Sequence, residues 1–301
     1  MAKEGLQLFG GDWTEQKLDA LDQYLRAYVK VLSKQSYETH YIDAFAGTGY
    51  REQPPKPQHN EPALFFEGLE PLQQEEPQRF LDGSARLALK VEPPFDHYLF
   101  IELRAKKILE LEKLKGEFPE LAPRIDIQRK DANVSIKSIC STWRKARDRG
   151  VLFLDPFGME VDWATLTAVA ATKTIDVWIL FPFAVNRLLT EKPQDIPSHW
   201  RNRLDKMFGT RAWHNRFYAE REIENIFDGS KTVVEKNLTL RGLGKFYFER
   251  LVKLFPAVAP NPRILTNTRG SPLFQLFFAA GNAGRGGEIA LRIAKYILEH
   301  I

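Results

Sequence analysis

The spacing of apolar residues predicts a long amphipathic helix near the start of the chain, followed by a short strand. Between residues 10 and 35, Leu and Val recur on one helical face, and Asp12 and Thr14 compete as the N-cap of this helix. The apolar positions of that face are Leu18, Leu21, Leu25, Val29 and Leu32. Residues 37–45, YETHYIDAF, are an apolar run of strand length that leads directly into a Gly-Thr-Gly turn.

From residue 97 onward, strand patterns alternate with helix patterns. Strands are predicted at 97–103, 124–131, 151–158 and 175–183, and helices at 104–118, 132–146 and 162–172. A helix at 82–91, capped by Asp82 or Ser84, comes before them. Strands alternating with helices at these lengths form βαβ units around a parallel sheet. We therefore predict an α/β fold with a Rossmann-like, doubly wound, mostly parallel sheet and an N-terminal helix.

The alternation is interrupted between residues 187 and 256, where we expect an inserted, mostly helical lobe. Its two helical stretches, 199–227 and 243–255, are dense in Arg, Lys and aromatic residues. Residues 262–282 then predict two strands joined by a turn at 269–271, and residues 286–300 predict a closing helix. The expected organisation is one core, residues 1–186 and 257–301, with the lobe as a substrate- or partner-binding insertion.

The composition indicates the class of protein but does not indicate a particular reaction. A chain of 301 residues can bury one large core. The formal charge of +4 and the pI near 9.0 slightly favour acidic binding partners. The single cysteine, Cys140, excludes an internal disulfide framework, and a free thiol suits a reducing compartment. Because no apolar stretch has the length of a signal peptide or bilayer span, we expect a soluble, cytoplasmic protein without membrane contact.

Acidic residues stand where four predicted strands end: Asp43, Glu102, Asp131 and Asp155. In a doubly wound sheet, ligands bind beyond the carboxyl ends of the strands. Asp43 could reach a hydroxyl or amino group there, Glu102 a ribose diol and Asp131 an adenine amino group. The ordinary alternative is that each acid caps the helix that follows it.

The turn after the first strand has the residues that close approach to a ligand requires. Gly47 and Gly49 let the backbone bend sharply without Cβ clashes. A lone Gly-x-Gly is weak by itself, since ordinary strand-to-helix turns also use glycine. Its place beside four acids at four strand ends favours a ligand-binding function.

These motifs resemble those of class I S-adenosylmethionine-dependent methyltransferases. The matching segments are YIDAFAGTG, the acid of FIEL, the acid of RKDAN, and DPFG. More narrowly, GGDWTEQKL, LDPFGMEVDWATL, DVWILFPF and PLFQLFFAAGNAG resemble the three-Cys-motif partner protein (TcmP) family, over nearly the whole chain. That family is named for a neighbouring protein with a three-cysteine motif like those of radical-SAM enzymes. The resemblance implies the fold, an S-adenosylmethionine cofactor and a three-Cys-motif partner.

The resemblance also assigns cofactor contacts. It implies a cofactor loop made of Asp43, Ala44, Phe45, Ala46, Gly47, Thr48 and Gly49. Glu102 matches the ribose-binding acid, and Asp131 with Ala132 matches the adenine contact. The separation from Asp43 to Glu102 is far longer than the roughly 20 residues of a compact dinucleotide-binding unit. The Pro-rich segment 51–61 must therefore loop out, as a lid or as an exposed insertion.

Asp155, Pro156 and Phe157 are the candidate catalytic residues. Methyltransferases that act on amines of bases or amides place an Asp, Asn or Ser before Pro-Pro and an aromatic residue after this strand. The acid and the first Pro carbonyl hold the amino group, and the aromatic ring stacks on the substrate. Here Gly158 follows Phe157 and the second Pro is missing, so the motif is shortened. The alternative is a tight turn in which Asp155 caps a helix and Phe157 packs in the core.

Four further residues are candidates near the cofactor. Lys17, on the first helix, either faces the cofactor mouth or lies in solvent, and Trp13 is either a cofactor contact or a hydrophobic anchor. Asn186 and Arg187 follow the fifth strand and are candidates for the substrate rim.

The lobe interleaves cations with aromatic residues, which suits phosphate neutralisation and base stacking on a nucleic acid. The alternative is a helix pair whose aromatic residues form the lobe's own core and whose cations are solvated. His199 and His214 lack the spacing of a metal site, and we predict none.

Taken together, the sequence predicts a methyltransferase that acts on an amine of a nucleic-acid base with a three-Cys-motif partner. A protein or small-molecule amine stays open as substrate. The alternative from another class is a cofactor-binding subunit without transfer activity in a nucleic-acid processing or repair complex.

Overall fold

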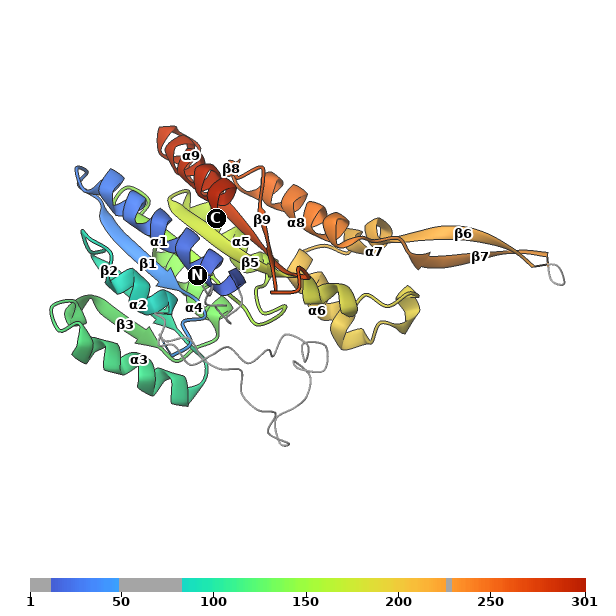
Figure 1. Cartoon of the computed structure of the whole chain (residues 1–301), viewed down its shortest axis with the longest axis horizontal. Helices are drawn as coiled ribbons and strands as arrows, with labels where there is room; N and C mark the ends of the chain where they lie inside the picture. The colour runs from blue at the N-terminus through green and yellow to red at the C-terminus, as the bar shows by residue number, and fades with distance from the viewer. Residues whose placement is uncertain (1–11, 49–82, 226–228) are drawn as a thin grey trace, which may run out of the picture.

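The computed structural model describes residues 12–48, 83–225 and 229–301, which form a central sheet between two layers of helices (Figure 1). The strands of the sheet are β1 Glu38–Asp43, β2 His97–Ile101, β3 Ile125–Gln128, β4 Asp148–Leu154, β5 Ile175–Pro182, β8 Ala257–Val258, β9 Arg263–Thr266 and β10 Pro272–Ala280. Their order is β3-β2-β1-β4-β5-β10-β8, and β9 also pairs with β10. Strands β1 to β5 are parallel and β10 is antiparallel, so the predicted Rossmann-like, doubly wound fold is confirmed.

Helices cover both faces of the sheet. One face packs against α1 Asp12–Leu32, α2 Ser84–Leu89, α3 Ala105–Glu117 and α9 Arg285–His300; the other packs against α4 Ala132–Thr142, α5 Trp163–Thr172 and α8 Leu240–Leu254. Alternate side chains of β5 pack into the two cores. Ile179 and Phe181 lie in the core beside α4, α5 and α8, and Trp178 and Leu180 lie in the core beside α1, α2, α3 and α9. Because both faces are covered, β5 is buried at every position, which explains its uninterrupted apolar run from Val177 to Pro182.

The winding of the sheet reverses at β1, which lies between β2 and β4. We call the side where β1 to β5 end the carboxyl edge, and the side where they begin the amino edge. Such a reversal leaves a crevice at the carboxyl edge, where open α/β sheets bind their ligands. The ends of β1 and β4 are therefore the place to look for a site.

The predicted pair of strands near the C-terminus is confirmed as β9 and β10, which are antiparallel. Gly270 in their turn has φ +77°, a left-handed conformation that glycine adopts readily. The Asn267 side chain accepts hydrogen bonds from the backbone N–H groups of Arg269 and Ser271.

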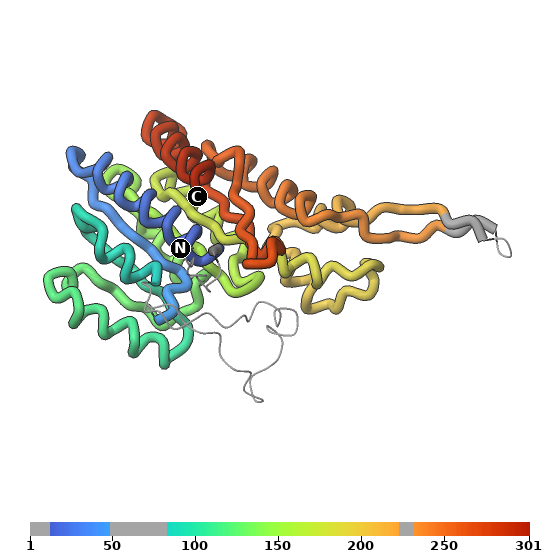
Figure 2. Tube along the Cα trace, viewed as in Figure 1, coloured from blue at the N-terminus to red at the C-terminus, as the bar shows by residue number. Residues whose placement is uncertain are grey.

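The prediction of a mostly helical lobe is wrong for residues 218–225 and 229–236, which form the two antiparallel strands β6 Tyr218–Asn225 and β7 Gly229–Lys236. These strands project as a narrow arm beyond the helices of the lobe, α6 Ser198–Phe208 and α7 Ala212–Phe217 (Figures 1 and 2). Ala, Glu and Arg in β6 are good helix formers, so local composition favoured a helix. Pairing with Thr232, Val233 and Val234 of β7 overrides that preference.

Two predicted helix starts also differ. Asp12 is the first residue of α1 and Thr14 lies inside it, so neither is its N-cap. The N-cap of α2 is Gly83, without a side-chain cap, while Asp82 lies outside the described residues. Segment 51–61 also lies outside them, so its role as lid or insertion stays a prediction. None of the helices in the described parts of the chain has the length and apolar character needed to cross a bilayer.

Candidate functional site

Asp43 is a fully buried acid at the end of β1. Its Oδ1 accepts a hydrogen bond from the Phe45 N–H at 3.2 Å, and its Oδ2 lies 3.4 Å from the Tyr41 hydroxyl. Burial raises the pKa of Asp43 to about 7, although hydrogen bonds from Ser84, Phe45 and Tyr41 favour the charged form; the Asp155 carboxylate raises it further. Within the described residues, Asp43 forms no ion pair.

The turn after Asp43 is inserted between the two neighbouring strands. The Ala44 N–H donates to the Phe153 carbonyl of β4 at 3.1 Å, and the Ala46 N–H donates to the Ile101 carbonyl of β2 at 3.0 Å. Gly47 follows with φ +61°, and no atom of the described residues outside the turn lies within 4 Å of the position that a Cβ would take. The backbone at Gly47 is therefore open to a ligand. Gly49 lies outside the described residues.

Lys17 and Asp155 form an ion pair across this crevice. Lys17 Nζ lies 2.6 Å from Asp155 Oδ2, and the two side chains are 10% and 23% exposed. Lys17 comes from α1 and Asp155 directly follows β4, so the pair ties the covering helix to the end of the sheet. Lys17 thus faces the carboxyl edge and not solvent. Asp155 is not a helix cap, since the N-cap of α5 is Asp162.

Trp13 packs against Lys17. Its ring stacks on Phe274 of β10 with centroids 4.9 Å apart, and Lys17 Nζ lies 4.7 Å from the Trp13 ring centroid. Trp13 therefore anchors the first turn of α1 on the sheet and covers Lys17.

Glu102 is held by the backbone that follows it. Its Oε1 accepts hydrogen bonds from the N–H groups of Leu103 and Arg104, both at 2.9 Å, and Arg104 is the N-cap residue of α3. Oε1 of Glu102 thus stabilises the start of α3, as the helix-capping alternative predicts. The same bonds fix the orientation of the carboxylate at the carboxyl edge.

Asp131 is the N-cap of α4, and its Oδ1 accepts a hydrogen bond from the Val134 N–H at 3.0 Å. The capping interpretation therefore applies to this acid. Asp131 is exposed and the neighbouring Ala132 is buried. A contact of either residue with adenine stays a prediction.

Phe157 projects into solvent, with 60% of its surface exposed, so the interpretation as a core residue is wrong. Its N–H donates to Glu160 Oε2 at 2.8 Å, and Lys107 Nζ lies 5.1 Å from its ring centroid. Pro156 is buried. The turn at residues 155–158 thus exposes the Phe157 ring at the carboxyl edge and buries Pro156.

Sequence reasoning missed several residues of this edge. The Ser84 hydroxyl, at the start of α2, donates to Asp43. Leu103 and Val134 are exposed apolar side chains in the segments that follow β2 and β3, as Phe157 is after β4. Asn133 accepts from the Asp162 N–H and donates to the Glu160 carbonyl, which fixes the loop after β4. The available signal was that each exposed apolar residue closely follows a strand-end acid.

A small pocket beside Pro156 connects the sheet to the lobe. Its walls include Pro156, Gly158, Pro182, Met207 of α6 and Tyr247 of α8. The lobe therefore borders the carboxyl edge at the end of β5.

The two rim candidates follow β5 in the short helical turn η4 Phe183–Arg187. The backbone carbonyl of Asn186 accepts from Lys236 Nζ at 3.0 Å, and the buried Asn186 Oδ1 has no partner in the described part of the chain. Arg187 is exposed. Both residues lie next to the lobe, and a substrate contact of either stays a prediction.

The large aromatic residues of the lobe are buried in the same core as β4, β5 and α5. Phe208, Trp213, Phe217 and Tyr218 are buried. The lobe's cations include Arg203, paired with Asp162, and Arg211, paired with Asp205. The burial of these rings agrees with the alternative, but the rings join the core of the sheet and do not form a separate one. These four buried rings are not available to stack on bases.

No protein-family model and no curated protein matches the sequence. Among solved structures, protein LPL1258 from Legionella pneumophila is similar at 17% identity, over 79% of this chain and 92% of that one, with a TM-score of 0.39. Spermidine synthase from Thermotoga maritima is similar at 14% identity, over 91% and 62%, with a TM-score of 0.37. The putative methyltransferase yhhF from Escherichia coli is similar at 13% identity, over 72% and 88%, with a TM-score of 0.26. At these values the similarities leave the reaction and substrate open.

Proposed function

We propose that the chain is an S-adenosylmethionine-dependent methyltransferase whose reacting centre lies at the carboxyl edge. The observation that carries the proposal is Asp43, a buried acid without an ion-pair partner in the described residues, directly before an open glycine turn. Burying a carboxyl group without a cation is unfavourable, so such a group suggests a ligand that compensates it.

The residues of this edge fit a cationic cofactor. S-adenosylmethionine carries a sulfonium and an ammonium group against one carboxylate, so its charge complements Asp43. Gly47 leaves room for the close approach of that charged end. Glu102 would hold the ribose, and Asp131 with Ala132 the adenine, as the family resemblance implies. The exposed apolar side chains of Leu103 and Val134 would pack against the adenine ring.

The residues after β4 fit the orientation of an amine acceptor. When bound, S-adenosylmethionine supplies an electrophilic methyl group. Lys17 fixes Asp155 through Oδ2, which leaves Oδ1 to accept a hydrogen bond from the amine. The exposed ring of Phe157 suits stacking on a planar base, and the Pro156 carbonyl is the second candidate acceptor. Holding the nucleophile in line supplies most of the rate enhancement in such a transfer.

The proposed substrate is an amine of a nucleic-acid base, methylated together with a three-Cys-motif partner. A base must leave its stack to reach a recessed site, unless it is already single-stranded or mispaired. Exposed cations of the lobe, such as Lys206, would contact phosphates. Stacking would come from Phe157 and not from the lobe's buried rings.

A non-catalytic, cofactor-binding subunit is the second candidate. Two observations favour it: the Asp155 carboxylate is already bound to Lys17, and the motif after β4 lacks its second proline. In this case the chain would bind the cofactor and its partner without transferring a methyl group.

A transfer assay separates the two. Labelled S-adenosylmethionine is supplied to the chain with single-stranded DNA or RNA, with and without the three-Cys-motif protein. We expect label in the nucleic acid, its loss in Asp155→Ala with cofactor affinity retained, and no change in Asp195→Ala, which removes an exposed acid of the lobe. Cofactor binding without transfer under all conditions would favour the non-catalytic subunit, and absence of cofactor binding would contradict both.

A further inference from the structure

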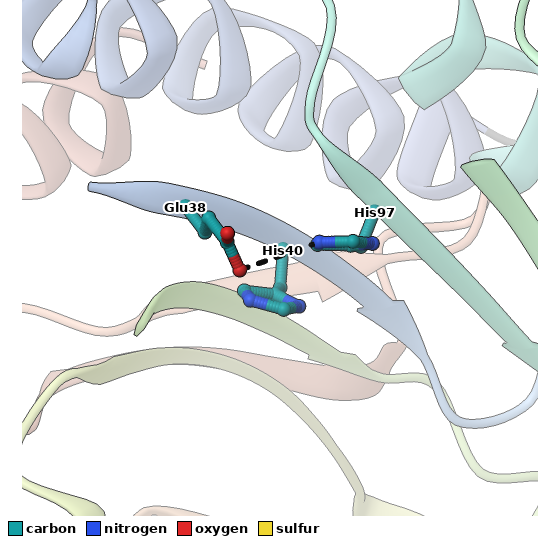
Figure 3. A group of neighbouring side chains, drawn as sticks. All are labelled: Glu38, His40 and His97. Carbon is teal, nitrogen blue, oxygen red and sulfur yellow. Dashed lines mark ion pairs between the residues drawn. The ribbon is translucent and has the colours of Figure 1, made fainter. Parts of the chain in front are cut away.

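Two histidines and a glutamate meet at the amino edge of the sheet, on β1 and β2 (Figure 3). Glu38 and His40 are two residues apart in β1, so their side chains share one face of the strand. His97 of β2 is the register partner of His40, and the two rings stack with centroids 4.6 Å apart. One ligand atom from each residue lies within 4.8 Å of the others. The strand register itself therefore gathers three metal-binding side chains.

Asp148 fixes the orientation of His40. His40 Nε2 lies 3.3 Å from Asp148 Oδ1, and because a carboxylate only accepts, Nε2 carries the hydrogen and Nδ1 keeps its lone pair. Asp148 is buried and faces Glu38 across the β1–β4 ladder. A carboxylate behind a histidine is the arrangement that orients histidine ligands in metal sites.

We propose that Glu38, His40 and His97 bind a divalent transition-metal ion, and that Zn²⁺ fits the site. Two imidazole nitrogens and one carboxylate oxygen are ligands that zinc prefers, and three protein ligands leave a fourth position for water. Tetrahedral zinc with bonds of about 2.0–2.2 Å separates its ligand atoms by about 3.3–3.6 Å. Glu38 Oε2 and His97 Nε2 are 3.6 Å apart, so small side-chain rotations complete the geometry.

Two arginines limit the affinity of this site. Arg144 and Arg147 both form ion pairs with Glu38, and Arg144 also binds Asp148. They hold the Glu38 carboxylate in place, but their positive charge opposes a cation. Removing one of them should therefore tighten metal binding. Arg147 is the better choice, because its side chain is 60% exposed and Arg144 also supports Asp148.

The proposed metal site is separate from the carboxyl edge. Glu38 is the first and Asp43 the last residue of β1, which places them about 17 Å apart along the strand. A metal at Glu38 would join β1 to β2 and stabilise the folded chain by mass action. Methyl transfer at the carboxyl edge does not depend on it, so either proposal can fail alone.

The test is titration of Zn²⁺ into the full chain by calorimetry, with thermal unfolding measured in parallel. We expect one Zn²⁺ per chain and a rise in Tm, with affinity at least tenfold weaker and no rise in Tm for His97→Ala. The matched control His199→Ala, which removes an exposed histidine of the lobe, should bind as the native chain does, and Arg147→Gln should bind more tightly. Equal binding by His97→Ala and the native chain would overturn the proposal, as would no binding by either the native chain or Arg147→Gln.

Discussion

The acidic residues at the two ends of β1 have pKa values that are shifted in opposite directions. At the amino edge, Glu38 pairs with Arg144 and Arg147, and a hydrogen bond from Arg144 is the main cause of its lowered pKa. Burial alone would raise the pKa of the neighbouring Asp148, but hydrogen bonds from Arg144 outweigh it and lower the pKa. At the carboxyl edge, burial raises the pKa of Asp43 to about 7, and no cation pairs with it among the described residues.

The direction of the pKa shift decides whether an acidic residue stabilises or destabilises the folded chain. A carboxyl group whose pKa is lowered on folding stabilises the folded state at neutral pH, whereas one whose pKa is raised destabilises it. Groups of the second kind gather at functional sites, where a ligand or a reaction compensates them. The contrast therefore points to the carboxyl edge as the place of function.

A raised pKa by itself does not mark a site, as Asp176 shows. Burial raises its pKa to about 7 as well, yet its carboxylate accepts from the Tyr24 hydroxyl at 2.7 Å and from the Gly281 N–H. Asp176 lies at the start of β5, on the amino edge. It matches Asp43 in burial and pKa but not in position, which makes it the natural control.

Asp43→Asn should have the largest effect on stability. The folded-state pKa lies above the unfolded one, so the folded chain loses stability as pH rises from about 4 to about 7 and does not regain it above. A shift of about three pKa units corresponds to about 4 kcal/mol. Asparagine removes this cost, so the variant should be more stable than the native chain by up to about 4 kcal/mol at pH 8, and by less at pH 5.

Urea unfolding at both pH values measures this effect. Asp176→Asn should behave in the same way, and Asp126→Asn, at an exposed acid of β3, should change nothing. A native chain more stable than Asp43→Asn at pH 8 would contradict the proposed state of this acid.

Lys17→Met should have the next largest effect. It leaves Asp155 without its partner in a mostly buried position, and we expect a loss of about 2 kcal/mol, below the range for fully buried pairs because Asp155 is partly exposed. Methyl transfer should fall at least about tenfold, since Asp155 is no longer held in place. Lys17→Arg should keep most of both. If Lys17→Met changed neither the stability nor the rate of methyl transfer, the Lys17–Asp155 pair would have no role in either.

Gly47→Ala should cost about 1 kcal/mol, because a left-handed φ is unfavourable for alanine although space is free. Cofactor affinity should fall as well, since the new methyl group points into the space proposed for the ligand. Gly116→Ala, in α3 with no atom near its Cβ position, should instead stabilise the chain slightly. Calorimetry and unfolding of both variants test this; unaltered affinity in Gly47→Ala would place the cofactor elsewhere.

Arg147→Gln should have the smallest effect, because the pair it forms with Glu38 is partly exposed. We expect a loss below about 1 kcal/mol at pH 7, which shrinks in high salt. The loss should also disappear at acidic pH as Glu38 becomes protonated, since the stability from a lowered pKa is present only above it. Unfolding at two salt concentrations measures this; a large, salt-independent loss would mean that Arg147 has a packing role.

Much of the fold could be predicted because each element carries its own pattern. Local signals include the apolar run of residues 177–182 in β5, the alternation of strands with helices from residue 97, and the Arg-Gly-Ser turn before β10. The β6–β7 arm could not be predicted, because residues 218–225 have the composition of a helix and become strands only through pairing with β7.

The sequence predicted where the four acidic residues lie in the fold, but not all of their contacts. Strand ends located Asp43, Glu102, Asp131 and Asp155, because the carboxyl ends of parallel strands share one edge. The sequence could not show that Lys17 binds Asp155. The hydrogen bonds of Glu102 and Asp131 to the helix starts that follow them agree with the capping alternative that the sequence left open. The meeting of Glu38, His40 and His97 was also missed, because it depends on the register between two strands far apart in sequence.

The most direct test of the account is calorimetric binding of S-adenosylmethionine at pH 8 to the native chain, Asp43→Asn and Asp176→Asn. A hydrogen bond or contact to a charged group is worth about 1.5–3 kcal/mol, so losing the Asp43 charge should weaken binding about 10- to 100-fold. We predict that the native chain and Asp176→Asn bind alike and that Asp43→Asn binds at least tenfold more weakly. Equal affinity in all three chains, or no binding by the native chain, would contradict a cofactor site at the end of β1.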